Sequence, residues 1–377
     1  MKFLYSHRVR AGDGQRVHID ALTQALAARG HEVVICGPAH DGALDAAGRR
    51  GAAGLLPRPL YECAEYGYSL PAFLRLAAAA RASTPDAIYE RCNLFFHAGV
   101  WTKRKTGLPL ILEVNAPLAE ERAVHGGLAF KQWARRSEAA VWRAADMTLP
   151  VTAALAGRLR AAGVDDEKIE VVHNGVGEDF LTVRDGAAVR ARYGLTDKIV
   201  LGFAGFVRDW HRLDRVLRFL SADGRDDLHL LVVGDGPARA DLQALAERLG
   251  AATRATFTGV VQRDVMADHV AAFDIALQPA STEYASPLKL FEYMAQAKAI
   301  LAPDSANIRE ILSDGADALL FAEENFERML TTLAGDAALR GRLGAAARES
   351  LIRRDFTWAA NARRVEAIGE RLKEKTS

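Results

Sequence analysis

One segment in the carboxyl-terminal half constrains the fold of this chain more than any other. It runs from an apolar strand at residues 274–279, through a loop rich in Pro, Ser and Ala, into a helix that ends before a second strand at 300–302. Ser286 is a good N-cap, and Pro287 suits a first helical turn. The order strand, loop, helix, strand predicts a parallel sheet of the α/β class.

The start of this helix is a candidate anion site. Its unbonded N–H groups and the positive end of its dipole point outward at the carboxyl end of the strand. Leu288, Phe291 and Met294 recur at helical spacing and are expected to face a core, whereas Lys289 and Glu292 fall off that stripe. Glu292 lies about one and a half turns into the helix, where its carboxylate can accept hydrogen bonds from a ribose. The alternative is an ordinary crossover helix with its carboxylate in solvent.

Residues 286–295 read SPLKLFEYMA, and this motif resembles the nucleotide-sugar signature of the retaining GT-B glycosyltransferases of family four. The common family pattern is E-x7-E, and SPxKLFEYMA is a known variant of it. The resemblance implies that Glu292 is the ribose ligand. It also implies phosphate contacts at the start of the helix, by Ser286, Pro287, Leu288 and Lys289. The first acid of the pattern would fall on Tyr284, so the sugar-contacting acid carries over onto its neighbour Glu283.

Length and composition predict a soluble globular protein of two domains. The chain has 377 residues, of which half are hydrophobic and 26% are charged. A net charge of +1 argues against nucleic acid as a partner. Three widely spaced cysteines suggest a reduced compartment and no structural zinc. With no signal peptide and no apolar run of about 20 residues, we expect a cytoplasmic protein, and weak peripheral association with the inner membrane face stays open.

The amino-terminal residues predict a βαβ unit. A strand at 3–5 is followed by a polar loop that ends in Gly-Asp-Gly, by a helix and by a second strand at 32–36. The loop lacks G-x-G-x-x-G, so the dinucleotide fingerprint is absent. The resemblance implies that the loop glycines, Gly12 and Gly14, approach the donor phosphates. His18 would then lie in the first turns of the helix, near the substrates.

Polar side chains end two further strands of the first domain. Glu90 and Arg91 follow the strand at 87–89, while Glu113 and Asn115 follow the strand at 110–112. Because ligands bind beyond the carboxyl ends of strands in such sheets, these side chains are acceptor-side candidates. The alternative is that they cap neighbouring helices. In many relatives a His stands where Asn115 stands here, and an Asn can bind a sugar hydroxyl but cannot exchange a proton.

The second domain is expected to begin near residue 187. Its first strand, at 199–205, is followed by Arg208, His211 and Arg212, and three basic groups at the end of a strand suit a diphosphate. The commoner family pattern has Arg directly after the glycine and Lys five residues later. Arg208 is the best substitute for that Arg, and His211 or Arg212 replaces the Lys. Backbone groups at Val260 are expected to meet the base.

A basic, aromatic helix is predicted at residues 125–146. It contains Lys131, Arg135 and Arg136 together with Trp133 and Trp142. Such a helix can lie on a membrane surface, which would suit a lipid-linked acceptor. The alternative is a solvated outer helix whose Trp side chains belong to the core.

These features predict GT-B architecture, with two Rossmann-like domains facing each other across a deep cleft. The acceptor-side domain would span 1–186, the nucleotide-sugar domain 187–356, and a helix at about 357–377 would pack back onto the first. The resemblance implies transfer of a sugar from a nucleotide-diphosphate-sugar to an acceptor hydroxyl with retention of configuration. UDP is the commonest nucleotide among such enzymes and GDP the next. The acceptor can be a glycan, a lipid-linked molecule or a small molecule.

The resemblance further implies a reaction without a metal or another cofactor, since the chain has no Asp-x-Asp. Arg208, His211, Glu283 and Asn115 would be the catalytic residues. Two alternatives remain at this stage. A GT-B epimerase or hydrolase would need carboxylates such as Glu90 and Glu113. A non-catalytic nucleotide-sugar-binding scaffold would account for the displaced first acid and the missing Lys. No pattern in the sequence predicts the donor sugar, the linkage or the oligomeric state.

Overall fold

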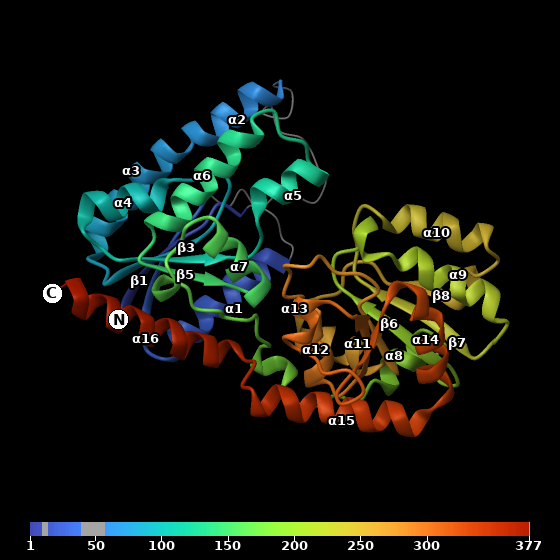
Figure 1. The fold of residues 1–377 in the computed structure, drawn as a ribbon. Coiled ribbons are helices and arrows are strands. Elements are labelled where there is room, and N and C mark those ends of the chain that lie inside the picture. The colour runs from blue at the N-terminus through green and yellow to red at the C-terminus, as the bar shows by residue number, and fades with distance from the viewer. Residues whose placement is uncertain (10–13, 39–56, 377) are drawn as a thin grey trace. The chain divides into compact units, whose positions relative to one another are not determined.

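The protein is described by a computed structural model that places residues 1–9, 14–38 and 57–376 (Figure 1). The chain divides into two compact units. The first unit contains Met1–His173, Tyr284–Ser286 and Trp358–Ser377, and the second contains Asn174–Glu283 and Pro287–Thr357. Each unit is built around one parallel sheet, and the two units are described separately below.

The first unit contains a five-stranded parallel sheet with the strand order β2-β1-β3-β4-β5. Its strands are β1 (Lys2–Ser6), β2 (Glu32–Cys36), β3 (Ala87–Arg91), β4 (Leu110–Val114) and β5 (Met147–Pro150). Apart from the edge strand β2, these strands are almost fully buried. Burial on both faces is typical of a parallel sheet covered by crossover helices.

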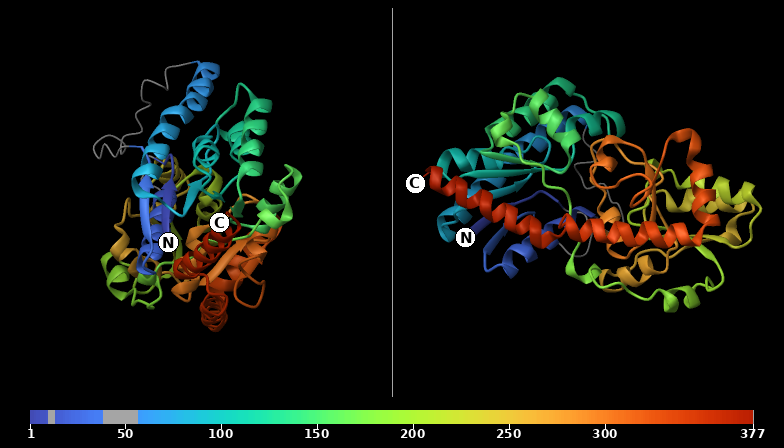
Figure 2. Two further views of the ribbon diagram at one scale, coloured as in Figure 1. Left: turned by 90° about the vertical axis from the view of Figure 1, so that its left-hand side faces the viewer. Right: turned by 60° about the horizontal axis from the view of Figure 1, so that its bottom comes forward.

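Helices cover both faces of this sheet (Figure 1 and Figure 2). They are α1 (Gly14–Ala28), α2 (Arg58–Gly67), α3 (Ser69–Ser83), α4 (Ala98–Thr106), α5 (Leu118–His125), α6 (Lys131–Ala144), α7 (Ala153–Ala161) and α16 (Trp358–Thr376). Apolar side chains of α3, α4, α6 and α7 pack with Leu4, Ile88 and Leu112 on one face. Helices α1 and α16 pack against each other on the opposite face, where Phe3 contacts Gly369.

The second unit contains a six-stranded parallel sheet with the order β11-β10-β9-β6-β7-β8. Its strands are β6 (Ile199–Ala204), β7 (Leu228–Val233), β8 (Ala255–Phe257), β9 (Ile275–Leu277), β10 (Ala299–Pro303) and β11 (Leu319–Phe321). Its helices are α8 (Ala187–Arg192), α9 (Leu213–Asp223), α10 (Arg239–Arg248), α11 (Met266–Ala271), α12 (Leu288–Ala295), α13 (Ala306–Arg309), α14 (Phe326–Gly335) and α15 (Ala337–Arg353). Successive strand residues enter two separate apolar cores, one on each face.

Both sheets have a point at which the strand order reverses. In the first sheet the chain moves outward in both directions from the β1–β3 pair, and in the second it does so from the β6–β9 pair. Open α/β sheets bind ligands beyond the carboxyl ends of the strands at this topological switch point. The α/β prediction is therefore confirmed, and the topology directs attention to the residues after β1, β3, β6 and β9.

Several local predictions differ from the structure. The N-cap position of α12 is Pro287 rather than Ser286, and it makes no side-chain capping bond. Residues 174–186 group with the second unit, whereas the sequence analysis placed them with the first. The physical reason is that Val176 and Phe180 are buried in a core of the second unit.

A buried tyrosine completes the switch point of the second sheet. The register of β6 and β9 ends at the pair Gly202 and Ala276. Beyond it, the N–H of Ala204 donates to Tyr293 Oη at 2.9 Å, and Tyr293 Oη donates to the carbonyl of Leu277 at 3.5 Å. The hydroxyl thus bridges the ends of two strands that no longer bond each other. Its burial raises the pKa of Tyr293, so the group stays a neutral donor.

We predict that Tyr293→Phe destabilises the protein by about 1–3 kcal/mol, because it leaves a buried N–H without a partner. Chemical unfolding of the two proteins measures this difference. Tyr61→Phe is a matched control on α2, where the tyrosine is half-buried. Equal stability of Tyr293→Phe and the unsubstituted protein would contradict the bridging role.

Candidate active site

Two glycine turns lie in contact at the carboxyl end of the second sheet. Gly205 follows β6 with φ +128°, and Gly234 follows β7 with φ +136°, a region that side-chain-bearing residues rarely adopt. A Cβ on Gly234 would lie 2.1 Å from the carbonyl oxygen of Gly205. The N–H of Val207 also donates to the carbonyl of Asp235 at 2.9 Å. The absence of side chains therefore lets the loop after β6 lie against the loop after β7.

Arg208 is held by aromatic rings in the loop after β6. Its guanidinium carbon lies 4.6 Å from the ring centre of Phe206 and 4.7 Å from that of Trp210. Both rings are large, partly exposed apolar groups, at 42% and 39% of their surface. Cation–π contact on two sides restrains a long cationic side chain without neutralising it. The structure thus places Arg208 just beyond the strand end, as the sequence predicted.

His211 is a neutral member of this group. Burial first, and then the charges of Lys289 and Arg208, lower the pKa of His211 to about 2. Its Nδ1 accepts the N–H of Arg208 at 3.3 Å, so the ring proton lies on Nε2. His211 can donate a hydrogen bond to an anion but brings no positive charge. Arg212 is exposed in a left-handed conformation, and its Nε donates to Asp214 at 3.1 Å.

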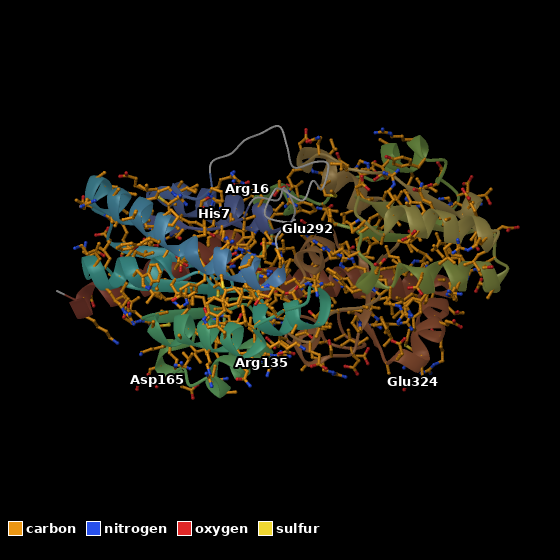
Figure 3. The ribbon with its side chains drawn as sticks, turned by 90° about the horizontal axis from the view of Figure 1, so that it is seen from above. His7, Arg16, Arg135, Asp165, Glu292 and Glu324 are labelled. Carbon is orange, nitrogen blue, oxygen red and sulfur yellow. The ribbon has the colours of Figure 1, made fainter. Side chains whose placement is uncertain are left out.

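Glu292 lies on α12, the helix that follows β9, and is labelled in Figure 3. Its carboxylate pairs with Arg263, whose Nε also contacts Asp179 Oδ2 at 3.2 Å. The Arg263 guanidinium lies 4.5 Å from the ring centre of Phe180. Burial raises the pKa of Glu292 although the Arg263 charge opposes that shift. The ion pair restrains the carboxylate that the sequence assigned to the ribose.

Arg263 is a site residue that the sequence analysis missed. It stands in the polar run Gln262–Asp264, far along the chain from its partner Glu292. A single Arg in a polar run carries no local signal, since most such residues are solvated. The fold alone brings Arg263, Asp179 and Glu292 together.

Val260 and Glu283 lie in exposed positions. Val260 follows β8 and is 75% exposed, which leaves its backbone accessible to a ligand. Glu283 is exposed in the middle of the loop between β9 and α12. Tyr284, where the common motif has its first acid, groups with the first unit: its carbonyl accepts from Thr152 Oγ1 at 2.9 Å, and its ring lies 5.3 Å from the Arg158 guanidinium carbon. The buried Ser286 follows in the same segment.

A buried polar network lies at the end of β4 in the first unit. Glu113 accepts hydrogen bonds from Tyr89 Oη at 2.9 Å and from Arg91 Nη1, and it contacts His18 Nε2 at 3.0 Å. Asn115 Nδ2 also donates to it. Burial alone would raise the pKa of Glu113, but His18 and Arg91 hold it well below its usual range. Three predicted acceptor-side residues, His18, Arg91 and Asn115, thus converge around the ionised carboxylate of a fourth, Glu113.

Glu90 lies on the opposite face of the same sheet. Neighbouring residues of a strand point to opposite faces, and it is Arg91, not Glu90, that pairs in register with Glu113. Ser6 Oγ donates to Glu90 Oε2 at 2.8 Å, and a Cβ on Gly99 would lie 2.6 Å from its carboxyl group. Burial raises the pKa of Glu90 to about 8. Glu90 is therefore a neutral group within the core, separated by the sheet from Glu113.

Gly14 is the first residue of α1, and its predicted partner Gly12 lies outside the described residues. Within residues 1–9, 14–38 and 57–376, no three His, Cys, Asp or Glu side chains are grouped as a metal site requires. No helix of this described part is long and apolar enough to cross a membrane.

Comparison with known proteins identifies the family. The chain matches the family models described as Glycosyltransferase Family 4, over residues 12–180, and Glycosyl transferases group 1, over residues 198–335. A D-inositol 3-phosphate glycosyltransferase of Streptomyces scabiei is 30% identical, over 90% of this chain and 83% of that protein. The chain belongs to glycosyltransferase family 4. It is therefore a transferase, as its sequence predicted.

Further relatives and solved structures agree with this assignment. A GDP-mannose-dependent α-mannosyltransferase of Mycolicibacterium smegmatis is 27% identical, over 75% of this chain and 73% of that protein. HepE of Anabaena, solved in complex with UDP, has a TM-score of 0.78 at 16% identity, covering 98% of this glycosyltransferase and 99% of that chain. The lipopolysaccharide glycosyltransferase WaaG has a TM-score of 0.71 at 19% identity, covering 96% and 98%. These likenesses confirm the GT-B fold.

We predict that Glu90→Gln makes the glycosyltransferase less sensitive to alkaline pH. The folded-state pKa of Glu90, about 8, lies above its ordinary value of 4.5. Its contribution to stability is therefore full below pH 4.5 and is lost as the pH rises to about 8. The unfolding free energy of Glu90→Gln, relative to that of the unsubstituted protein, should therefore rise by about 1–4 kcal/mol between pH 5 and pH 8.

Urea unfolding of both proteins at pH 5 and pH 8 measures this gain. Glu247→Gln, at an exposed position of α10, is the matched control and should change nothing. If the difference in unfolding free energy between the two proteins is the same at pH 5 and at pH 8, Glu90 is not held neutral.

Proposed function

We propose that this family 4 enzyme transfers a sugar from a nucleotide-diphosphate-sugar, most simply a UDP-sugar, to an acceptor hydroxyl. Transfer proceeds with retention of configuration and without a metal ion. The product belongs to polysaccharide, glycolipid or other glycoconjugate synthesis. The donor binds at the switch point of the second sheet, and the acceptor binds to groups of the first unit.

One observation carries this proposal: groups suited to bind an anion and a ribose lie after β6 and β9. Arg208 lies after β6, and the N–H groups at Leu288 and Lys289 begin α12 after β9. These donors suit a diphosphate, because a cationic fork and a helix start both stabilise negative charge. Glu292, restrained by Arg263, has the chemistry that a ribose requires.

The proposed reaction takes place on one face of the donor sugar. The bond between the anomeric carbon and the phosphate oxygen breaks, and the acceptor oxygen attacks from the side that the diphosphate leaves. The acceptor proton passes to a phosphate oxygen, so the products are the glycoside and the nucleoside diphosphate. Arg208 stabilises the charge that develops on the leaving group, and His211 donates a hydrogen bond from Nε2. Glu283 and Asn115 are proposed to contact sugar hydroxyls.

The related proteins point to two different nucleotides. HepE is solved with UDP and with UDP-glucose, whereas the mannosyltransferase relative is named for GDP-mannose. A 2-deoxystreptamine glucosyltransferase of Streptomyces kanamyceticus is a further relative, 31% identical over 49% of this chain and 50% of that protein. UDP is proposed first because it is the commonest nucleotide among such enzymes.

The alternative activity, epimerisation or hydrolysis of a nucleotide-sugar, draws less support from these residues. It needs catalytic carboxylates, for which Glu90 and Glu113 were the candidates. The two groups lie on opposite faces of the sheet, and Glu113 is occupied by three donors of its own unit. The scaffold alternative predicts nucleotide binding without transfer to any acceptor.

The proposed function predicts binding of one nucleoside diphosphate that does not depend on a metal ion. Calorimetric titration of UDP, GDP, ADP and TDP, with and without EDTA, measures it. Glu292→Gln should weaken binding by about 1–3 kcal/mol through the lost ribose hydrogen bond. Glu324→Gln, exposed in the same unit and labelled in Figure 3, is the matched control.

Loss of nucleotide binding in EDTA would contradict the metal-independent mechanism. Unchanged affinity of Glu292→Gln would refute its ribose role. Binding without turnover of donor on any acceptor would favour the scaffold.

Weak peripheral association with an anionic membrane is proposed from a surface of the first unit. Helices α2 and α3 follow one another almost in line (Figure 1). Along them Leu60, Leu70 and Leu74 are exposed by 57%, 55% and 59%, with exposed small residues between them, and Leu70 and Leu74 lie about one helical turn apart on α3. The predicted basic helix, α6, matches the second interpretation given for it: Trp142 is buried, Trp133 is half-buried against Tyr66 of α2, and the exposed side is cationic. Its basic residues there are Lys131, Arg135, Arg136 and Arg143.

An apolar stripe beside a cationic helix face matches the apolar and negative parts of an anionic bilayer surface. We predict that the protein sediments with vesicles containing phosphatidylglycerol and that the double variant Leu70→Ser with Leu74→Ser abolishes this binding. Ile352→Ser, which replaces an exposed aliphatic side chain on α15, is the control. Nucleotide affinity should not change in either variant. Binding that is equal for neutral vesicles, or self-association through the stripe, would contradict the proposal.

A further inference from the structure

Lys289 occupies a position that is electrostatically unfavourable for a cation. It is the second residue of α12, in the first turn of the helix. The first turn carries the positive end of the helix dipole, which stabilises anions and repels cations. A basic residue is therefore out of place here in the free protein, unless an anion is bound.

The surroundings of the Lys289 ammonium do not supply that anion. Nζ lies 3.8 Å from the ring centre of Phe203 on β6, and this cation–π contact attracts the ammonium without neutralising its charge. Within the described part of the chain, no carboxylate lies within ion-pair distance of Nζ and no acceptor is hydrogen-bonded to it. Glu292, the nearest acid on its own helix, pairs with Arg263 instead. Burial consequently lowers the pKa of Lys289 to about 7, against the opposing effect of Glu292.

The charged groups around Lys289 do not change this conclusion. From the loop after β6, His211 lies close to it, and the charges of Lys289 and Arg208 both lower the pKa of the His211 ring. From the other side, Arg263 and Asp179 form the network that binds Glu292. The local balance of these groups is cationic, and the neutral state of His211 is one sign of it.

The Lys289 ammonium also lies at the switch point of the second sheet. A Cβ on Gly205 would lie 3.3 Å from Lys289 Cε and 3.5 Å from Nζ, so the ammonium occupies the space beside the turn after β6. The residue itself belongs to the helix after β9. The side chain therefore joins the two strand ends between which this kind of sheet binds its ligand.

We propose that the side-chain ammonium of Lys289 binds the diphosphate of the donor and supplies the second cation of that site. This inference rests on the proposed function and deepens it. The sequence expected this cation at His211 or Arg212, but His211 is neutral and Arg212 is bonded to Asp214. The cation comes instead from α12, where the expected contact was a backbone N–H alone.

Binding of a diphosphate to this ammonium is coupled to proton uptake. In the free protein Lys289 is about half protonated at pH 7. A bound anion favours the charged form, so the bound protein holds the proton at pH 7 and above. Nucleotide binding at pH 7.5 should therefore draw roughly 0.5–1 proton from the buffer, and affinity should fall about tenfold between pH 6 and 8.

Calorimetric titration with UDP or GDP, whichever binds, in two buffers of different ionisation enthalpy measures the proton uptake at pH 7.5. Lys289→Met removes the charge but keeps the length of the side chain. We expect it to weaken binding about 10–100-fold and to abolish the uptake. Because the same nucleotide is used for all variants, its own phosphate ionisation cancels in the comparison.

Lys298→Met is a matched control within the same unit. Lys298 is also a largely buried lysine, and burial lowers its pKa to about 8. Its Nζ donates to the carbonyl of Ala271 at 2.6 Å, and it precedes β10, at the opposite end of the sheet from the strand ends described above. Lys298→Met should change neither nucleotide affinity nor proton uptake.

Free Lys289→Met should melt at the same temperature as the unsubstituted protein or higher at pH 7, since it removes an unpaired cation. Lys289→Gln repeats the comparison if the Met variant does not fold. Equal affinity and equal proton uptake in the Lys289 variants and the unsubstituted enzyme would overturn the inference while leaving the proposed function intact. Failure of the unsubstituted protein to bind any nucleoside diphosphate would overturn both.

Discussion

The second unit depends on one buried hydroxyl group. Tyr293 joins the last N–H of β6 to the carbonyl of Leu277 at the place where those strands stop bonding each other. The same residue belongs to α12, so the hydrogen bonds fix the helix against the gap that it covers. Lys289 lies about one turn before Tyr293 on that helix, and Glu292 directly precedes it. Their positions beyond the strand ends follow from this attachment.

The first unit separates its buried carboxyl groups by means of its sheet. Glu113 is kept ionised by donors and cations on the face that α1 and α16 cover. Glu90, on the other face, is kept neutral by burial beside Ser6 and Gly99. Two carboxylates that are close in the strand register therefore have opposite ionisation states. Only the ionised one is surrounded by the polar groups that a sugar acceptor could replace or join.

Much of the fold could be predicted because short apolar runs and helical periodicity are local properties. The strand Glu32–Cys36 was predicted with its observed bounds, and SPLKLFEYMA identified α12 and its Glu. Arg263 and the charge state of His211 could not be predicted, because each depends on groups that only the tertiary fold brings near.

The turn after β6 also links two positions that are distant in the chain. Gly205 has a backbone conformation suited to glycine, and the space beside it is filled by the Lys289 side chain. A larger residue at 205 would press on the lysine, while a shorter residue at 289 would leave that space unoccupied. The residue size that position 205 accepts is therefore coupled to the length of the side chain at position 289.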